Sequence, residues 1–190
     1  KSVEKEIPAS RIYLFYAMML LCMTGLLGIT ITGDAFNLFV FLEVSSLSTY
    51  VLISFGNDRR ALTAAYRYLI MGTIGATFYI IGVGMMYMVT GTLNITDLGV
   101  LVPGMADNRT IQAALAFLTV GLAIKAALFP LHMWLPNAYT YAPSAVTVFL
   151  AATATKVSIY VLIRVFYTIF GPAFSFETLP LDWVLLPLAI

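Results

Sequence analysis

The amino-acid sequence predicts an all-α protein, a polytopic transmembrane helix bundle. Of its 190 residues, 10 are Lys or Arg and 9 are Asp or Glu, whereas about a quarter of a soluble domain is charged. Hydrophobic residues make up 61% of the chain, and the mean hydropathy is +0.95. Apolar runs of about 20 residues recur, which is the length of a helix that crosses the hydrocarbon core. This composition excludes an ordinary soluble enzyme, a nucleic-acid-binding protein and a disordered tail.

Five stretches are long enough to span a bilayer as helices, and they are continuous rather than alternating as barrel strands would be. They are residues 11–32, 36–55, 61–90, 111–129 (with a break at 130–142) and 144–169. A minimal turn at Gly33 and Asp34, where Asp34 caps the second span, joins the first two, and a longer connection precedes the fourth. A truncated span would open at residue 181. We therefore expect residues 1–190 to form a single transmembrane domain that is a fragment of a longer protein.

The distribution of basic residues orients these spans, because cytoplasmic loops carry an excess of Lys and Arg. The N-terminal segment and the second loop with the turn after it hold Lys1, Lys5, Arg11, Arg59, Arg60 and Arg67. The opposite side holds Arg109 and Arg164. We expect the N-terminal end to lie in the cytoplasm, with Arg67 and Arg164 reaching lipid head groups from about two turns inside the helix ends.

Three ionisable residues fall in the middle of predicted spans: Glu43 in the second, Lys125 in the fourth and Lys156 in the fifth. A charge at the centre of a membrane helix costs about 2.5–3.5 kcal/mol, so it normally faces a partner or a wet cavity. One carboxylate cannot neutralise two ammonium groups. This composition favours a proton relay, and the alternative is a static ion pair that locks helices together.

The fourth span is predicted to break. Pro130 lacks the N–H that would bond the carbonyl of Ala126, and Pro136 and Pro143 follow closely. Broken helices with charged residues recur in ion-coupled transporters. His132 comes just after the break, and a lone histidine is either a packing residue or, through its ordinary titration near neutral pH, a relay group.

The remaining residues give no evidence of a cofactor or a metal. Cys22 has no Cys or His near it in sequence, so no zinc or iron–sulfur site is evident. Gly82 and Gly84 lie inside a span and lack the third glycine of a dinucleotide motif. No oxygen-rich cluster marks a Na+ site. The aromatic residues Trp134 and Tyr141 are expected in interfacial belts.

Three segments carry a resemblance to a known family. Residues 33–44 read GDAFNLFVFLEV, residues 125–138 read KAALFPLHMWLPNA, and residues 142–164 hold Lys156 on the helix that follows. They resemble the antiporter-like membrane subunits shared by respiratory complex I, membrane-bound hydrogenases and Mrp-type Na+/H+ antiporters, with the D subunit of the Mrp type most similar. The resemblance extends over nearly all of the chain.

The resemblance implies the first of two inverted five-helix units, with Glu43 as the pair-forming acid, Lys125 as the lysine at the break and Lys156 as the central relay lysine. It implies a proton-translocating subunit of a multisubunit Na+/H+ antiporter in a prokaryotic plasma membrane. Its partners would be other membrane subunits, lipid and protons, with no nucleic acid, and whether Na+ binds this subunit stays open. In this hypothesis Lys125 passes its proton through water, with His132, to Lys156.

Two alternatives stay open. The same module can serve a redox-driven complex, such as a complex I-like NADH-quinone oxidoreductase or a membrane-bound hydrogenase, although this chain holds no redox or hydrolytic site of its own. The third possibility is a membrane scaffold that transports nothing and uses its ion pairs only to hold helices together.

Overall fold

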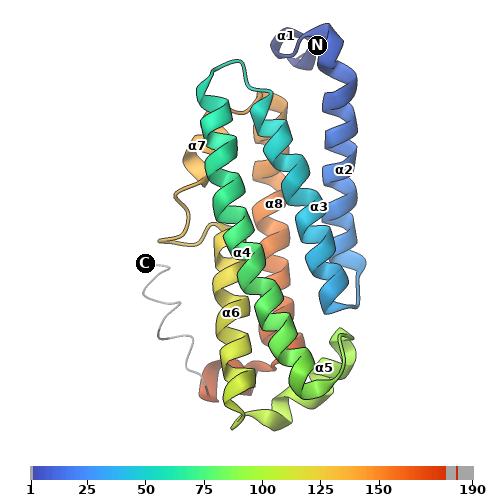
Figure 1. Ribbon diagram of the computed structural model, residues 1–190, viewed down its shortest axis with the longest axis vertical. Helices are drawn as coiled ribbons and strands as arrows, with labels where there is room; N and C mark the ends of the chain where they lie inside the picture. The colour runs from blue at the N-terminus through green and yellow to red at the C-terminus, as the bar shows by residue number, and fades with distance from the viewer. Residues whose placement is uncertain (1, 179–182, 184–190) are drawn as a thin grey trace.

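The structure is a computed structural model that describes residues 2–178 and Trp183. Five long helices run side by side: α2 (Ile12–Ile31), α3 (Ala35–Ser54), α4 (Arg60–Thr90), α6 (Arg109–Ala126) and α8 (Ser144–Ile163) (Figure 1). The shorter helices are α1 (Ser2–Glu6), α5 (Ile95–Leu101), α7 (Leu135–Tyr141) and the single turns η1 (Ala9–Arg11), η2 (Val102–Met105), η3 (Arg164–Ile169) and η4 (Phe174–Thr178). The predicted all-α fold with five membrane-spanning helices is confirmed. Except for Trp183, the span predicted from residue 181 lies outside the described residues.

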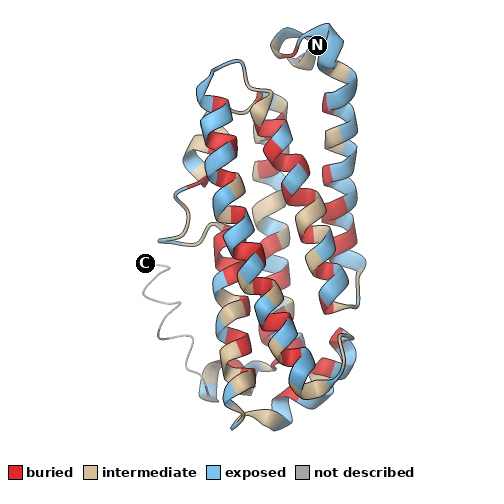
Figure 2. Ribbon diagram, viewed as in Figure 1, coloured by how far each residue is buried: buried red, intermediate tan, exposed pale blue. Residues whose placement is uncertain are grey.

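The five long helices form a ring in which each contacts its neighbours. α2 packs on α3, α3 on α4, α4 on α6 and α6 on α8, and α8 closes the ring against α2. Buried residues face the inside of this ring and exposed residues its outside (Figure 2). The outward side chains of α2 include Tyr13, Leu20, Leu27 and Ile31, all more than half exposed. Apolar side chains on the outside and a closed interior are what a helix bundle in lipid requires.

Small residues let α4 and α6 approach closely, as membrane helices require in the absence of a hydrophobic driving force between them. A Cβ atom on Gly121 would lie 2.6 Å from the carbonyl oxygen of Gly75, which is too close for any side chain. Gly72 and Ala76 lie on the same buried side of α4. These small residues therefore allow α4 and α6 to pack at a short distance from each other.

Polar caps end the helices at the turns between spans. The Asp34 carboxylate accepts the N–H of Asn37, which confirms Asp34 as the cap of α3. Asn94 caps α5 in the same way, and the connection between α4 and α6 is therefore partly helical rather than a plain loop. Arg164 donates to the carbonyl of Thr32 at 2.8 Å, so it ties the end of α8 to the end of α2.

An unusual cap begins α8. The residue before this helix is Pro143, whose side chain cannot accept a hydrogen bond, and the acceptor comes from the far end of the sequence. The Glu6 carboxylate accepts the backbone N–H of Ser144 at 2.7 Å and the Ser144 hydroxyl at 2.6 Å. These two hydrogen bonds favour the charged carboxylate and lower the pKa of Glu6 below its ordinary value. The contact fixes α1 against the first turn of α8.

We expect Glu6→Ala to lower the free energy of unfolding by about 1 kcal/mol at about pH 7, the usual cost of losing a helix cap. Because the folded protein lowers the pKa of Glu6, this stabilisation is present above the ordinary glutamate pKa and disappears as the pH falls through the lower folded value. Denaturant titration of the detergent-purified protein at about pH 7 and about pH 3 measures both. Glu177→Ala, at an exposed carboxylate, is the control, and an equal loss at both pH values contradicts the charged cap.

Candidate functional site

The site begins where α6 ends. α6 stops at Ala126, earlier than the predicted end at residue 129, and Ala127 adopts a left-handed conformation with φ of 56°. The cause is Pro130, which has no N–H for the carbonyl of Ala126 and whose ring would clash with it. The chain resumes as a helix only at Leu135. The predicted break is thus confirmed, and it places Lys125 in the last turn of α6.

Lys125 is paired with Glu43 from α3. The Lys125 Nζ atom donates to Glu43 Oε1 at 3.0 Å and to the Ser46 hydroxyl at 2.5 Å. Glu43 and Ser46 are one helical turn apart and therefore lie on the same face of α3. The Lys125 side chain is 4% exposed and that of Glu43 is 23% exposed. The ammonium is enclosed by protein, while the carboxylate keeps one side open.

The surroundings of Lys125 suit a positive charge. The last carbonyls of a helix have no partner within it and carry a partial negative charge. Lys125 stands in that last turn, and its ammonium donates to the Glu43 carboxylate and the Ser46 hydroxyl. A buried charge that loses such partners costs several kcal/mol. The protonated state of Lys125 therefore depends on Glu43 remaining in place.

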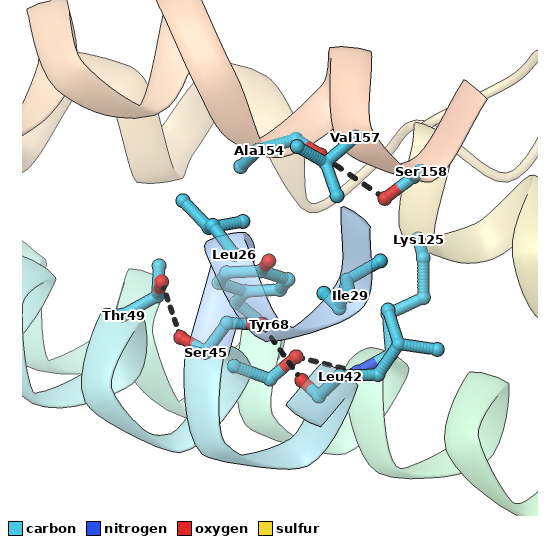
Figure 3. A pocket seen from close by; sticks show the side chains of 11 residues that line it. Leu26, Ile29, Leu42, Ser45, Thr49, Tyr68, Lys125, Ala154, Val157 and Ser158 are labelled. Carbon is cyan, nitrogen blue, oxygen red and sulfur yellow. Dashed lines mark hydrogen bonds between the residues drawn. The ribbon is translucent and has the colours of Figure 1, made fainter. Parts of the chain in front are cut away.

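A small cavity lies beside Lys125 inside the ring of helices (Figure 3). Its volume, counted as space for the centre of a water molecule, is about 20 Å³, enough to hold one water. Polar groups on its wall include the Lys125 side chain, Ser45 and Thr49 from α3, and Ser158 from α8. The wall also contains Val157, the residue next to Lys156. The cavity connects the pair to the face of α8.

A stack of aromatic rings supports the break. The Trp134 ring stacks on Tyr68 with centroids 3.8 Å apart, and Tyr68 meets Tyr50 edge to face at 4.7 Å. The Trp134 indole N–H donates to the carbonyl of Ile124 at 3.0 Å, so it satisfies a backbone group in the last turn of α6. The expectation that Trp134 belongs to an interfacial belt is wrong, because its side chain is buried.

The structure does not bring all four predicted residues into contact. Lys156 lies on the exposed side of α8, and its Nζ atom donates to the carbonyl of Ala151. The half-buried His132 ring lies 5.5 Å from that of Phe129, and its Nδ1 atom is buried without a hydrogen-bond partner among the described residues. Glu43 and Lys125 thus form the centre, and within the part of the chain that the structure describes neither Lys156 nor His132 hydrogen-bonds to it.

Sequence reasoning missed two contributors to this site, Ser46 and Trp134. Ser46 could have been found, because it follows Glu43 by one turn in a run of small polar residues. Trp134 had no comparable signal, because its position depends on how the chain folds back after the break.

Comparison with known proteins identifies the family to which the chain belongs. Residues 32–180 match the family described as NADH:quinone oxidoreductase/Mrp antiporter, transmembrane. The chain belongs to this family and is an integral membrane protein. The predicted resemblance to the antiporter-like membrane subunits is therefore confirmed.

Two relatives illustrate the range of this family. The chain is 56% identical over 153 residues to the N subunit of NADH-quinone oxidoreductase from Desulforudis audaxviator, covering 80% of the chain and 30% of that protein. It is 36% identical over 165 residues to the D subunit of the Na(+)/H(+) antiporter from Alkalihalophilus pseudofirmus, covering 86% of the chain and 34% of that protein. The chain thus spans about a third of the length of these curated relatives.

Solved structures share the fold. A chain of the membrane-bound sulfane sulfur reductase, an archaeal respiratory membrane complex, matches with a TM-score of 0.82 at 36% identity, over 90% of this chain and 34% of that one. A chain of the Mrp complex from Dietzia sp. matches with a TM-score of 0.74 at 35% identity, over 80% of this chain and 29% of that one. Both structures are of membrane complexes.

We expect Trp134→Phe to lower the free energy of unfolding by about 1–3 kcal/mol. The variant keeps a ring against Tyr68 but leaves the buried carbonyl of Ile124 without its donor, and an unsatisfied buried polar group costs this amount. Thermal or denaturant unfolding in detergent measures the loss. Trp183→Phe, at a side chain that is 79% exposed, is the matched control, and equal stability of the two variants contradicts the supporting role of Trp134.

Proposed function

We propose that this protein is a proton-translocating subunit of a multisubunit monovalent cation (Na+)/H+ antiporter. The observation that carries the proposal is the Glu43–Lys125 pair at the broken end of α6, beside a cavity that can hold water. The relative from the Na(+)/H(+) antiporter of Alkalihalophilus pseudofirmus and the Mrp complex structure support the antiporter. The chain covers about a third of these proteins, so one part of the whole path is proposed here.

The proposed transfer begins with Lys125 protonated and held by Glu43 and Ser46. When the Glu43 carboxylate moves away, the ammonium is left in an environment that disfavours an isolated charge. Lys125 then gives its proton to water in the adjoining cavity and becomes a neutral amine. When Glu43 returns, the pair favours the ammonium, and Lys125 takes up the next proton. The distance between the two side chains would therefore determine whether Lys125 holds or releases its proton.

We propose Lys156 as the acceptor that follows, with His132 assisting. The cavity is lined by three residues from the helix that carries Lys156, namely Ala154, Val157 and Ser158. A small rotation of this helix, or a chain of water molecules, would therefore connect the cavity to Lys156. Among the described residues the Nδ1 atom of His132 has no hydrogen-bond partner, so this position is free to bind water. The exposed Lys156 side chain would meet the next part of the path in the remainder of the longer protein.

We further propose a prokaryotic plasma membrane with the N-terminal end in the cytoplasm, on the basis of the excess of basic residues at that end. Other membrane subunits would surround the bundle, as in the complexes with which it shares its fold. The protein would act in this setting on protons.

Replacing the lysines tests the transfer directly. We expect Lys125→Met and Lys156→Met, each in the full-length protein within its complex, to reduce proton-coupled Na+ transport in reconstituted vesicles by at least about tenfold, because each removes a titratable group. Complex assembly, measured by copurification of the other subunits, should be retained. Lys5→Met, outside the spans, is the control. Undiminished transport by Lys156→Met removes that residue from the path.

Neutralising the acid separates transport from scaffolding. We expect Glu43→Gln to keep the shape of the site but slow transport, because the amide holds the ammonium far less strongly than a carboxylate. Transport rate and assembly are measured on the same preparation, with Glu177→Gln, which removes the same charge from an exposed carboxylate, as the control. Loss of assembly with an unchanged transport rate per assembled complex favours the scaffold alternative.

A second candidate is the same module in a redox-driven complex. The relative that is 56% identical carries the name of an NADH-quinone oxidoreductase, and this identity favours the alternative. The two candidates share the chemistry of the site and differ in the neighbours of the protein. Copurified flavin or iron–sulfur proteins would support the redox-driven complex, and their absence from an intact, active complex would support the antiporter.

A further inference from the structure

A groove on the outer face of the bundle carries positively charged side chains that take no part in the proposed proton transfer. It lies between the first turns of α4 and the short helix α7, which sit side by side (Figure 1). Its upper part, with a volume of about 240 Å³, is lined by Arg60, Thr63, Arg67, Asn137 and Tyr141. The groove thus brings together two guanidinium groups, two hydroxyls and one amide.

The positive charge in the groove is incompletely neutralised. The Arg60 guanidinium lies 3.8 Å from the Asp58 carboxylate and donates to the Tyr141 hydroxyl at 3.2 Å, with both ion-pair side chains largely exposed. Within residues 2–178 and Trp183, no acidic side chain lies within 4.0 Å of the Arg67 guanidinium. A ligand with negative charge would complement this part of the groove.

The lower part of the groove is mostly apolar. Arg67 and Asn137 are shared with a second hollow of about 270 Å³ whose remaining wall is Ile70, Met71, Met133 and Trp134. Met133 is 71% exposed and Ile70 is 43% exposed. From Arg60 to Ile70 the helix rises by about 15 Å, so the two adjoining hollows pass from guanidinium groups to flexible apolar side chains along the length of α4.

We propose that this groove binds one anionic phospholipid. Its phosphate would lie between Arg60 and Arg67, which can each donate two parallel hydrogen bonds to phosphate oxygens. Thr63 and Asn137 would contact the glycerol and ester oxygens, and the first part of an acyl chain would follow Ile70 and Met133. A free phosphate would use only the upper half, whereas a zwitterionic lipid would bring its own cation against the two guanidinium groups.

Lipid in this groove would contact the segment that supports the proton-transfer site. Trp134 forms part of the groove wall, and its indole N–H holds the carbonyl of Ile124 next to Lys125. An occupied groove would therefore steady α7 against α4 and stabilise the broken end of α6. This link makes thermal stability a suitable readout of binding.

The test titrates the full-length protein, purified in detergent within its complex, with phosphatidylglycerol, phosphatidylcholine or inorganic phosphate, and follows the unfolding temperature. We expect phosphatidylglycerol to raise it in a saturable way and the other two to have little effect. Arg67→Gln should weaken phosphatidylglycerol binding about fivefold, and the double change with Arg60→Gln about 25-fold, from the contribution of each basic residue near an anionic lipid.

Arg109→Gln, at the opposite end of the bundle, removes the same charge and should leave binding unchanged. Arg67→Lys keeps a positive charge for the case in which Arg67→Gln fails to assemble, and it should bind more weakly than the wild type and more tightly than Arg67→Gln. Equal stabilisation by phosphate or by phosphatidylcholine overturns the proposal. So does a loss of binding in Arg109→Gln as large as that in Arg67→Gln, or unchanged binding in Arg60→Gln and Arg67→Lys.

Discussion

The ion pair between Glu43 and Lys125 is the constraint on which the rest of this structure depends. Neither charge is stable alone among apolar helices, and each is acceptable only in the presence of the other. The two residues are 82 positions apart in the sequence and lie on different helices. Bringing them together requires α3 and α6 to face the same interior, and the ring of five helices provides that interior. The pair thus links the packing of the bundle to its chemistry.

The break in α6 gives this pair its position. A continuous helix would satisfy its own carbonyls and offer nothing to an ammonium in mid-span. Because Pro130 ends the helix, Lys125 stands in its last turn, and the chain returns toward α7 with the Trp134 indole N–H donating to the carbonyl of Ile124 in that turn. The cavity beside Lys125 supplies room for water at the same level. The group that binds the proton strongly, Lys125, therefore lies next to a space where water could accept that proton.

Much of the fold could be predicted from the sequence, because membrane helices are long apolar runs and proline breaks them. The Glu43 and Lys125 positions were equally evident, since charges are rare in such runs. What the sequence could not predict depends on tertiary contacts. Trp134 is buried because the segment after the break folds back on Tyr68, and Glu6 caps α8 from the other end of the chain. The sequence also could not predict that Lys125 is buried and Lys156 is exposed. A charged residue within a span does not by itself indicate which side of the helix faces the interior.

The mutual dependence of Glu43 and Lys125 is measured by a double-mutant cycle on the unfolding free energy. Glu43→Gln, Lys125→Met and the double variant would be compared with the wild type in the same detergent. If the two side chains form a mutually dependent buried ion pair, each single variant should lose about 3–5 kcal/mol, and the double variant should lose less than the sum of the two. If the two losses simply add, the side chains are not coupled in this way, and the account of the site is wrong.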